Sequence, residues 1–543
     1  MTCNTIEFAV RGCCFFGQTV TCGRHFTLKM TTEKTRVQLF FRAEGLSDRD
    51  TTSKSDPYLL LSTQPSVGAS AVLGRTETIA NSISPKWNTG VWLDYFFETR
   101  QDLSIRIFDD DSKGPGGDDT LGTATFQLAH AVSLGQNATG FKVKLASGDG
   151  HVFVTVQQSS TAGKRDTVVF QLSGRGLKKM DTFGQSDAYY TLYRVNPNGT
   201  KTLLHTSEVV SKSLTPTWNP PPVMKVIDLT TADMNQKTLR FEMFDKDLTS
   251  DDTMGWFDFS FNDLLEAGAG RRTFEACEGR EKFGEIVVSN FRLNRTPSFL
   301  DYLRGGMQMN LMVSIDFTGS NGDPHQRTSL HHMDPVHPNQ YVRAIMGVGD
   351  VLLQYDTDKQ VPAFGFGARL PDGNVNMCFH LNFDQNPYVP GVQGVLDCYG
   401  RALASVRLSG PTNFAPTIAT ANRLSRSSPG VYTVLLILTD GDITDMPETV
   451  NELVACDDAP LSIVVVGVGS ACDFAMMDQL DADRNPLRNS STGKQCRRDL
   501  VQFVPFKNFD RRPPAELAAE VLREIPDQVV DWAVLTRQPA PAA

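Results

Sequence analysis

The stretch DTTSKSDPYLLL (Asp50–Leu61) decides the fold of the first part of this chain because it occurs twice. DTFGQSDAYYTL (Asp181–Leu192) repeats its acidic residues, its Ser-Asp pair and its apolar end, 131 residues further along. ISPKWN (Ile83–Asn88) and LTPTWN (Leu214–Asn219) recur at the same offset of 131 residues. A spacing that is kept over two separate motifs indicates two homologous domains in tandem.

Each copy has the pattern of a β-sandwich. RVQLFFRAEGL (Arg36–Leu46) and HVFVTVQQ (His151–Gln158) are short apolar runs that partly alternate with polar residues and are bounded by turn-forming residues. The acidic block 109–122 returns as 245–255 and is three residues shorter there. Short strands, with a length change confined to a loop, predict two antiparallel sandwiches of roughly 120 residues each.

Length and composition narrow the class of protein. The chain has 543 residues, and a single core stops growing near roughly 250 to 300 residues, so several domains are expected. The formal charge of −10 excludes nucleic-acid binding through general basicity. No apolar run approaches the roughly 20 residues that a transmembrane helix needs. The first residues lack the pattern of a secretory signal, which predicts a cytoplasmic protein whose ten cysteines are free thiols.

Acidic residues gather at the ends of the predicted strands. One aspartate-rich loop is commonly only a solvated turn, but here two loops are acidic in each of two copies. Five carboxylates at one tip would repel one another without cations between them, and hard oxygen ligands suit Ca²⁺ better than Zn²⁺. The candidate ligands are Asp50, Asp56, Asp109, Asp111 and Asp119 in the first copy, and Asp181, Asp187, Asp245, Asp247 and Asp252 in the second, with Asp110, Asp118 and Asp251 as additional acids.

The SKSDPY, SPKW and FDDD elements, together with their second set, resemble those of C2 domains, the β-sandwiches that bind Ca²⁺ and phospholipids. The resemblance implies that the five aspartates of each copy hold two or three calcium ions at one tip. The second copy departs from the usual motif at Ala188, where proline is expected. Proline at that position shapes only the backbone, so the ligand assignment is kept.

The C-terminal half follows another pattern, in which buried strands alternate with amphipathic helices. This alternation predicts an α/β sheet with helices on both faces, and ligands of such sheets lie at the carboxyl ends of the strands. The predicted strands are MNLMVSID (Met309–Asp316), MCFHLNF (residues 377–383), VYTVLLIL (Val431–Leu438) and IVVVGVG (Ile463–Gly469), and the predicted helices are residues 339–355 and 394–408.

Three loops at those carboxyl ends carry oxygen ligands. IDFTGSN contains Asp316, Thr318 and Ser320, GPTNF contains Thr412, and LTDGDITD contains Asp440. Any one of them alone is typical of a helix N-cap or a strand-end turn. Together, and in this order, they resemble the metal-ion-dependent adhesion site of von Willebrand factor A domains. The resemblance implies a Mg²⁺ or Mn²⁺ ion with one position open for a carboxylate of a partner protein.

Two C2 domains followed by an A domain resemble the copine family, from about Arg36 to Asp531. Its most specific signatures here are SFLDYLRGG (Ser298–Gly306), IDFTGSNGDP (Ile315–Pro324), FGFGA (Phe364–Ala368), GPTNFAP (Gly410–Pro416), LTDGDITD (Leu438–Asp445) and VQFVPF (Val501–Phe506). The implied fold class is multidomain, with two antiparallel β-sandwich C2 domains before an α/β, Rossmann-like A domain. The expected divisions are an extension (1–35), C2 domain A (36–158), C2 domain B (165–295), the A domain (297–531) and a tail (532–543).

The resemblance implies a calcium sensor that moves from the cytoplasm to the plasma membrane or other membranes as Ca²⁺ rises. Anionic phospholipid membranes would be one partner, and proteins recruited by the A domain another. One alternative is a constitutive membrane scaffold, against which the complete aspartate sets argue. Another is a Mg²⁺-dependent enzyme, although phosphate-loop, nucleophile-elbow and zinc-protease motifs are missing.

Two further patterns suggest a zinc site and a lipid anchor, but each has a simpler interpretation. His325, His331, His332 and His337 fall within thirteen residues, but no cysteine or carboxylate stands at a characteristic zinc spacing. Cys13 and Cys14 precede two phenylalanines and are candidates for palmitoylation, yet the Met-Thr start offers no myristoylation glycine as a second anchor. A histidine-rich loop and a plain N-terminal extension are the preferred interpretations.

Overall fold

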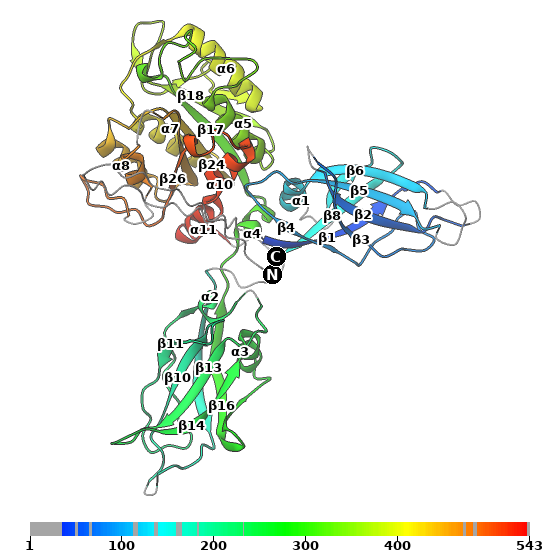
Figure 1. Cartoon of the computed structure of the whole chain (residues 1–543), viewed down its shortest axis with the longest axis vertical. Coiled ribbons are helices and arrows are strands. Elements are labelled where there is room, and N and C mark those ends of the chain that lie inside the picture. The colour runs from blue at the N-terminus through cyan, green and yellow to red at the C-terminus, as the bar shows by residue number, and fades with distance from the viewer. Residues whose placement is uncertain are drawn as a thin grey trace, which may run out of the picture.

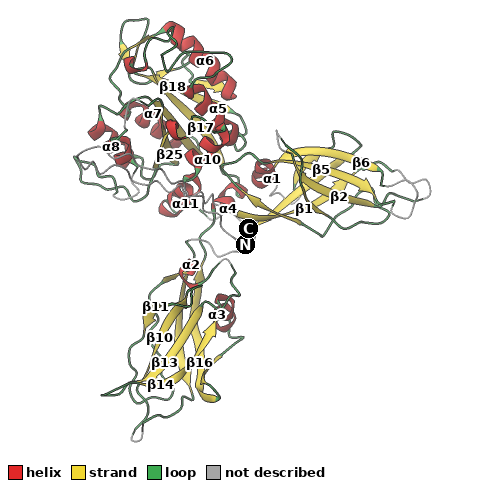
Figure 2. Cartoon of the chain, viewed as in Figure 1, coloured by secondary structure: helices red, strands yellow, loops and turns green. Residues whose placement is uncertain are grey.

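The computed structural model contains two β-sandwiches and one α/β domain (Figures 1 and 2). The structure describes residues 35–48, 53–64, 68–111, 118–134, 140–158, 165–181, 184–231, 233–470, 474–481 and 486–539. The N-terminal extension up to residue 34, with Cys13 and Cys14, and the connection 159–164 lie outside this range.

The first sandwich consists of two four-stranded antiparallel sheets. Strand β1 alternates strictly, so that Val37, Leu39 and Phe41 lie in the core while the residues between them are partly exposed. One sheet has the order β4 (Val91–Tyr95), β1 (Thr35–Glu44), β8 (His151–Gln158) and β7 (Phe141–Lys144), and the other has β3 (Val72–Arg75), β2 (Pro57–Thr63), β5 (Asp102–Asp109) and β6 (Thr120–Gln127), followed by helix α1 (Leu128–Leu134).

The second sandwich has the same construction, except that its strands form one continuous hydrogen-bonded path. The path runs β11 (Lys201–Thr206), β10 (Ala188–Val195), β13 (Leu239–Asp245), β14 (Asp252–Phe259), β15 (Phe274–Glu278), β16 (Glu281–Asn294), β9 (Thr167–Arg175) and β12 (Met224–Lys225), with helices α2 (Val226–Leu229) and α3 (Phe261–Gly268) beside it.

The repeated tryptophan explains why the SPKW and TPTW motifs recur. Trp87 and Trp218 are both fully buried. The indole N–H of Trp87 donates to the carbonyl of Pro57 (3.1 Å), and that of Trp218 donates to the carbonyl of Ala188 (3.0 Å). Each indole therefore fills the core and also satisfies the first carbonyl of the neighbouring strand, a combination that is common for buried tryptophan.

The α/β domain is built on parallel strands in the order β18 (Gln360–Phe366), β17 (Gln308–Asp316), β24 (Val431–Thr439), β25 (Leu461–Gly467) and β26 (Val501–Pro505). Leu311 and Val313 of β17 pack with one group of helices, and Met312 packs with the other. The first group is α5 (Gln340–Leu352), α6 (Gly391–Ser405), α10 (Pro514–Leu522) and α11 (Ile525–Leu535), and the second is α7 (Ala415–Arg426), α8 (Met446–Ala455) and α9 (Met477–Leu480).

Shorter elements complete this domain. Helix α4 (Phe299–Arg304) begins at Ser298, whose side chain accepts from the N–H of Asp301 in a capping box. The others are β19 (Ala368–Arg369), β20 (Val375–Asn376), β21 (Phe379–His380), β22 (Tyr388–Pro390), β23 (Arg407–Leu408), η1 (Gly319–Asn321) and η2 (Phe506–Asn508).

One predicted strand is wrong. Residues 377–383 form only the two-residue strand β21, which pairs antiparallel with β18, and β18 itself occupies the sheet position beside β17. The sequence QVPAFGF of β18 conceals a strand because it contains Pro362 and Gly365. Proline is tolerated since pairing with β17 begins only at Ala363, after the residue that cannot donate a hydrogen bond.

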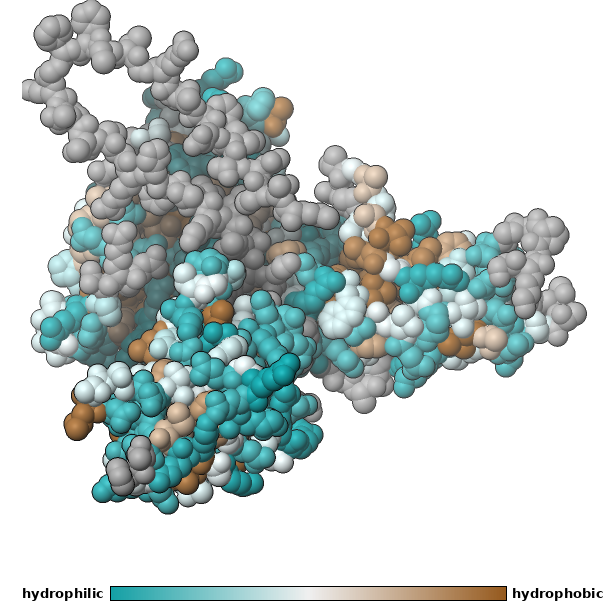
Figure 3. All heavy atoms as spheres, turned by 60° about the horizontal axis from the view of Figure 1, so that its bottom comes forward, coloured by the Kyte–Doolittle hydropathy of each residue, from teal (hydrophilic) through white to brown (hydrophobic). Residues whose placement is uncertain are grey.

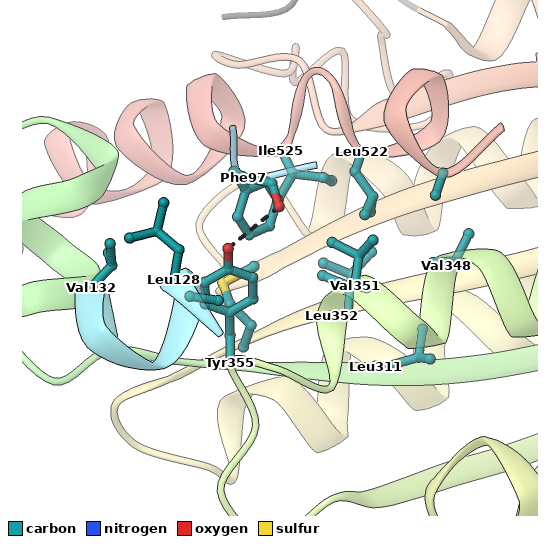
Figure 4. Packing of buried hydrophobic residues seen from close by; sticks show 14 of the residues in the cluster. Phe97, Leu128, Val132, Leu311, Val348, Val351, Leu352, Tyr355, Leu522 and Ile525 are labelled. Carbon is teal, nitrogen blue, oxygen red and sulfur yellow. Dashed lines mark hydrogen bonds between the residues drawn. The ribbon is translucent and has the colours of Figure 1, made fainter. Parts of the chain in front are cut away.

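An apolar interface joins the first sandwich to the α/β domain, which the sequence did not predict (Figure 4). The Phe97 ring packs edge-on against Phe299 (centroids 4.7 Å apart) and beside Tyr355 (5.0 Å). The buried hydroxyls of Tyr95 and Tyr355 are hydrogen-bonded at 2.7 Å. Leu128 and residues of α10 and α11 extend the same apolar cluster, so the two domains share one core.

The second sandwich is attached through polar contacts. The Arg165 guanidinium donates to the carboxylates of Asp527 (2.8 Å) and Asp531 (2.9 Å), one turn apart on α11. Its own apolar cluster contains only residues of the second sandwich. This sandwich comes forward in Figure 3, where its surface is largely hydrophilic. None of the helices in the described ranges combines the length and the apolar character needed to cross a bilayer.

We expect Phe97→Ala to lower the stability of the joined first sandwich and α/β domain by about 3 to 5 kcal/mol, because the ring would leave a cavity in a shared core. Differential scanning calorimetry of the full chain measures this loss. Phe96→Ala is the matched control, since Phe96 is only half-buried. A loss no larger than that of the control would contradict a packed interface.

Candidate cation sites

The first sandwich brings predicted ligands together at one end. Asp109 is the last residue of β5, and it is paired with Pro57, which follows Asp56. The N–H of Asp109 donates to the carbonyl of Asp119 (2.8 Å), and the N–H of Asp111 donates to the carbonyl of Asp109 (3.2 Å). These four aspartates therefore lie at the same tip. Asp50 lies outside the described residues.

Asp109 is the central carboxylate of this tip. It is buried, with 1% of its surface exposed, and its Oδ1 accepts a hydrogen bond from the N–H of Asp56 (2.5 Å). The Oδ1 of Asp56 accepts in turn from the N–H of Asn81 (2.6 Å). Within the described part of the chain, Asp109 Oδ2 has no hydrogen-bond partner. A buried, unpaired carboxylate oxygen costs free energy, and a cation in contact with it would remove that cost.

The second sandwich repeats this arrangement bond for bond. Asp245, the last residue of β13, accepts from the N–H of Asp187 (2.5 Å), and Asp187 accepts from the N–H of Lys212 (2.6 Å). Asp245 is 1% exposed, and its Oδ2 likewise has no hydrogen-bond partner among the residues that can be placed. Ala188 leaves the geometry unchanged, which agrees with proline having only a backbone role there.

The other second-copy ligands are close enough to interact electrostatically. Partial desolvation raises the pKa of Asp247, and the charges of Asp252, Asp181 and Asp245 raise it further. Asp252 is paired with Asp245 across strands β13 and β14. All five predicted aspartates of this copy thus lie around one tip, as a multi-ligand calcium site requires.

Among the described residues of the two tips, no three acids bring one oxygen each within 4.8 Å of one another. In the described ranges, only Asp481, Asp499 and Glu524 do so. No sequence pattern predicts this group, because its members are separated in the chain. The N–H of Phe503 donates to Asp481 (3.2 Å), so this acid ties the end of α9 to strand β26, and the N–H of Val501 donates to Asp499 (3.2 Å) at the start of the same strand.

The α/β domain brings four of its five predicted ligands into direct contact. Ser320 Oγ donates to Asp440 Oδ1 (2.9 Å), and Thr318 Oγ1 is 3.0 Å from Ser320 Oγ and 3.4 Å from Asp440 Oδ1. Asp316 joins them through the N–H of Thr318, which donates to Asp316 Oδ1 (2.7 Å). Two hydroxyls and two carboxylates therefore converge at the carboxyl ends of β17 and β24.

Burial controls the charge of this cluster. Asp316 is completely buried, and burial followed by the charge of Asp440 raises the pKa of Asp316 to about 7. Burial also raises the pKa of Asp440. Two neighbouring acids in a poorly solvated place resist ionisation unless a positive charge lies between them. Carboxylate and hydroxyl oxygens are suitable ligands for Mg²⁺ or Mn²⁺.

Thr412 lies on an adjacent loop. The N–H of Gly319 donates to the carbonyl of Ser409 (2.8 Å), which holds the Thr412 loop against the Thr318 loop. Thr412 is nearly buried, and its carbonyl accepts from the N–H of Thr444 (2.9 Å). In the part of the chain described here, no hydrogen bond connects the Thr412 side chain to the other four predicted ligands.

Two residues of this site were not predicted. Thr439 Oγ1 donates to Asp316 Oδ2 (2.7 Å), so both oxygens of Asp316 are hydrogen-bonded. Asp445 accepts from the N–H groups of Phe414 and Ala415 (3.0 Å each) and thereby caps α7 beside the Thr412 loop. Both residues belong to the LTDGDITD motif, but their partners lie far away in the sequence.

The histidines that are clustered in the sequence differ in how deeply they are buried. His331 is buried, with its ring 4.5 Å from that of Tyr341 and its Nδ1 2.6 Å from the hydroxyl of Tyr399, and burial lowers its pKa to about 3. His325 and His337 are largely exposed. His331 thus belongs to the core behind β17.

Comparison with known proteins identifies the parts of the chain. The family model described as Copine matches residues 329–539, and the C2 domain model matches residues 35–143 and 165–276. These matches and the observed sheets confirm the predicted fold class, two antiparallel C2 sandwiches followed by an α/β domain.

Several solved structures are similar to parts of the chain. The tandem C2 domains, A and B, of Extended-Synaptotagmin 2 in their calcium-bound form are 16% identical, with 48% of this chain and 98% of that chain covered and a TM-score of 0.21. BON1-C2B is 16% identical, with 25% and 95% covered and a TM-score of 0.22. The manganese-loaded TRAP protein of Plasmodium vivax is 12% identical, with 37% and 70% covered and a TM-score of 0.26.

We expect Thr439→Val to destabilise the α/β domain by about 1 to 3 kcal/mol in the absence of divalent cations, because Asp316 Oδ2 would lose its donor in a buried place. Urea unfolding followed by circular dichroism measures the change. Thr433→Val is the control, since Thr433 is also buried on β24 but does not contact Asp316. Equal effects of the two substitutions would show that the hydroxyl of Thr439 does not support Asp316.

Proposed function

Since the chain belongs to the copine family, with two C2 domains ahead of a copine domain, we propose that it docks on anionic phospholipid membranes when Ca²⁺ rises and recruits partner proteins through a metal-dependent A domain. C2 and copine domains are generally binding modules rather than enzymes. In this proposal the protein moves from the cytoplasm to the plasma membrane or other membranes.

One observation carries the calcium-dependent part of the proposal. Asp109 and Asp245 are equivalent residues in two copies, both are buried at a strand end, and both have one oxygen without a hydrogen-bond partner in the described chain. Their other oxygens accept identical bonds from Asp56 and Asp187. A surface loop that was merely solvated would not bury the same carboxylate oxygen in both copies.

Electrostatic forces explain why docking on the membrane would depend on Ca²⁺. Without bound cations, five aspartates at a tip repel an anionic leaflet. Bound Ca²⁺ contributes two positive charges per ion and coordination positions that lipid phosphate oxygens can fill. The carboxylates of the tip would hold the ions, and their positive charge would turn repulsion of the leaflet into attraction. Leu248, between Asp247 and Asp252, is fully exposed and places an apolar side chain where the second tip would meet lipid.

The position of the tips agrees with this role. In the first sandwich, β5 runs from Asp102, beside the α/β domain, to Asp109 at the tip. In the second, β13 ends at Asp245, at the end opposite to Arg165. Both tips therefore lie away from the α/β domain (Figure 1). Either tip can reach a membrane without displacing that domain.

The A domain is proposed to bind a partner through a divalent cation. Asp316, Thr318, Ser320 and Asp440 converge on one place, and Thr412 is held on the neighbouring loop. These residues would hold Mg²⁺ or Mn²⁺, which would supply a coordination position for an acidic side chain of the partner. The raised pKa of Asp316 supports the proposal, because a nearby cation would favour its ionised form.

We expect the full chain to sediment with phosphatidylserine vesicles only as Ca²⁺ is raised. Asp109→Asn with Asp111→Asn should weaken the first tip, and Asp245→Asn with Asp247→Asn the second, because each pair removes two ligand charges. With all four replaced, calcium-dependent sedimentation should be lost. Sedimentation of that variant at the wild-type calcium concentration would contradict binding through the tips.

A matched control is available in the second sandwich. Asp228→Asn with Asp233→Asn makes the same change in charge before the start of β13, at the end opposite to Asp245. Sedimentation of this variant should follow that of the wild type. If it were impaired as much as the tip variant, overall charge rather than calcium ligation would explain the loss.

For the A domain, we expect the chain carrying the four tip replacements to bind Mn²⁺, and Asp316→Ala in that chain to abolish the uptake. Electron paramagnetic resonance of free Mn²⁺ measures binding. The full chain is needed because the first sandwich shares a core with the α/β domain. Asp323→Ala, an exposed acid near the site, is the control. No uptake before the Asp316 replacement would show that this domain acts without the metal.

A further inference from the structure

A tyrosine binds the additional aspartate of the acidic loop in both C2 domains. Tyr58 donates its hydroxyl to Asp118 Oδ2 (2.5 Å), and Tyr189 donates to Asp251 Oδ2 (2.6 Å). The tyrosines are equivalent residues in β2 and β10. Each bonded aspartate directly precedes a predicted ligand, Asp119 or Asp252. In sequence, Asp118 and Asp251 stand out only as additional acids beside the predicted ligands.

The second copy shows what this bond does to the loop. Asp251 Oδ1 accepts from the N–H of Asp247 (3.3 Å), and its carboxylate also accepts from Lys246 Nζ (3.1 Å). One carboxylate therefore connects β10, the start of the acidic loop and its end. Both of its oxygens are occupied by donors, whereas Asp245 Oδ2 has no hydrogen-bond partner in the described ranges.

The geometry of both bonds indicates strong interactions. Their O–O distances of 2.5 Å and 2.6 Å lie in the range of bonds from a hydroxyl to a carboxylate. Such bonds are shorter than bonds between neutral groups and roughly twice as strong.

We propose that Tyr58 and Tyr189 are positioning residues for the calcium sites, each holding a non-ligand aspartate so that the acidic loop presents its ligand carboxylates at the tip. The inference rests on the proposed function. Without the bond, the loop would become ordered only when the cation binds. The free energy spent on ordering the loop would then weaken cation binding. The appearance of the same bond in loops of different length shows that it is retained where the rest of the loop varies.

The test uses the full chain with Asp109→Asn and Asp111→Asn, so that only the second tip responds to calcium. In that chain, Tyr189→Phe should raise the calcium concentration for half-maximal sedimentation with phosphatidylserine vesicles about tenfold to hundredfold, the loss expected for one hydrogen bond to a charged group. The plateau at saturating calcium should not change, because all ligand carboxylates remain. A midpoint equal to that of the parent would overturn the inference.

Tyr190→Phe is the matched control. Tyr190 follows Tyr189 on β10, is fully buried, and has a hydroxyl with no hydrogen-bond partner in the described part of the chain. Its replacement should leave the midpoint unchanged. A shift equal to that of Tyr189→Phe would mean that any loss of a phenol from β10 disturbs the tip, which would also overturn the inference.

Three further variants separate positioning from ligation. Asp251→Asn keeps an acceptor oxygen and the size of the side chain, so it should raise the calcium midpoint less than Asp251→Ala does. Asp252→Asn removes the charge of a ligand and should raise the midpoint most. If Asp251→Asn weakens binding as much as Asp252→Asn, Asp251 is itself a ligand and the positioning role is wrong. A wild-type chain that never responds to calcium would instead overturn the proposed function, and this inference with it.

Discussion

The structure depends on one constraint. Strands that pack in a core can bring carboxylates together for a cation only at their ends. Asp109, Asp245 and Asp316 are the last residues of β5, β13 and β17, and each is at most 1% exposed. Asp109 and Asp245 each accept a short bond from the N–H of the residue that precedes a neighbouring strand, and Asp316 accepts one from the N–H of Thr318, two residues further along the chain. In two unrelated folds, the central acid of a candidate cation site is thus placed by the same rule.

The two kinds of site differ in how the second oxygen of this acid is used. At the C2 tips, Asp109 and Asp245 keep one oxygen without a hydrogen-bond partner in the described residues. In the α/β domain, Thr439 donates to that oxygen of Asp316, and burial raises the pKa of the acid to about 7. In the described residues, the tips thus leave one oxygen of the central acid available to the proposed cation, whereas both oxygens of Asp316 already accept hydrogen bonds.

Domain packing divides the molecule into two parts, one joined by an apolar core and one attached through polar contacts. The first sandwich and the α/β domain share an apolar core around Phe97 and Tyr355, so the first tip and the A-domain site belong to one body. The second sandwich is held through Arg165, whose ion pairs are partly exposed and individually weak. Reorientation at a membrane would therefore cost least at the second sandwich.

The sequence by itself determined the repeats, the strand ends and the type of ligand, because these are local patterns of residues close together in the chain. Asp56 and Asp109, or Asp316 and Asp440, were predicted as neighbours since strand ends of one sheet meet at one edge. Strand β18 was missed because Pro362 and Gly365 break its pattern. Only the tertiary structure decided that Tyr189 binds Asp251, that Thr439 supports Asp316 and that Tyr95 meets Tyr355. Those contacts join residues from 62 to 260 positions apart, and their formation depends on how whole domains pack.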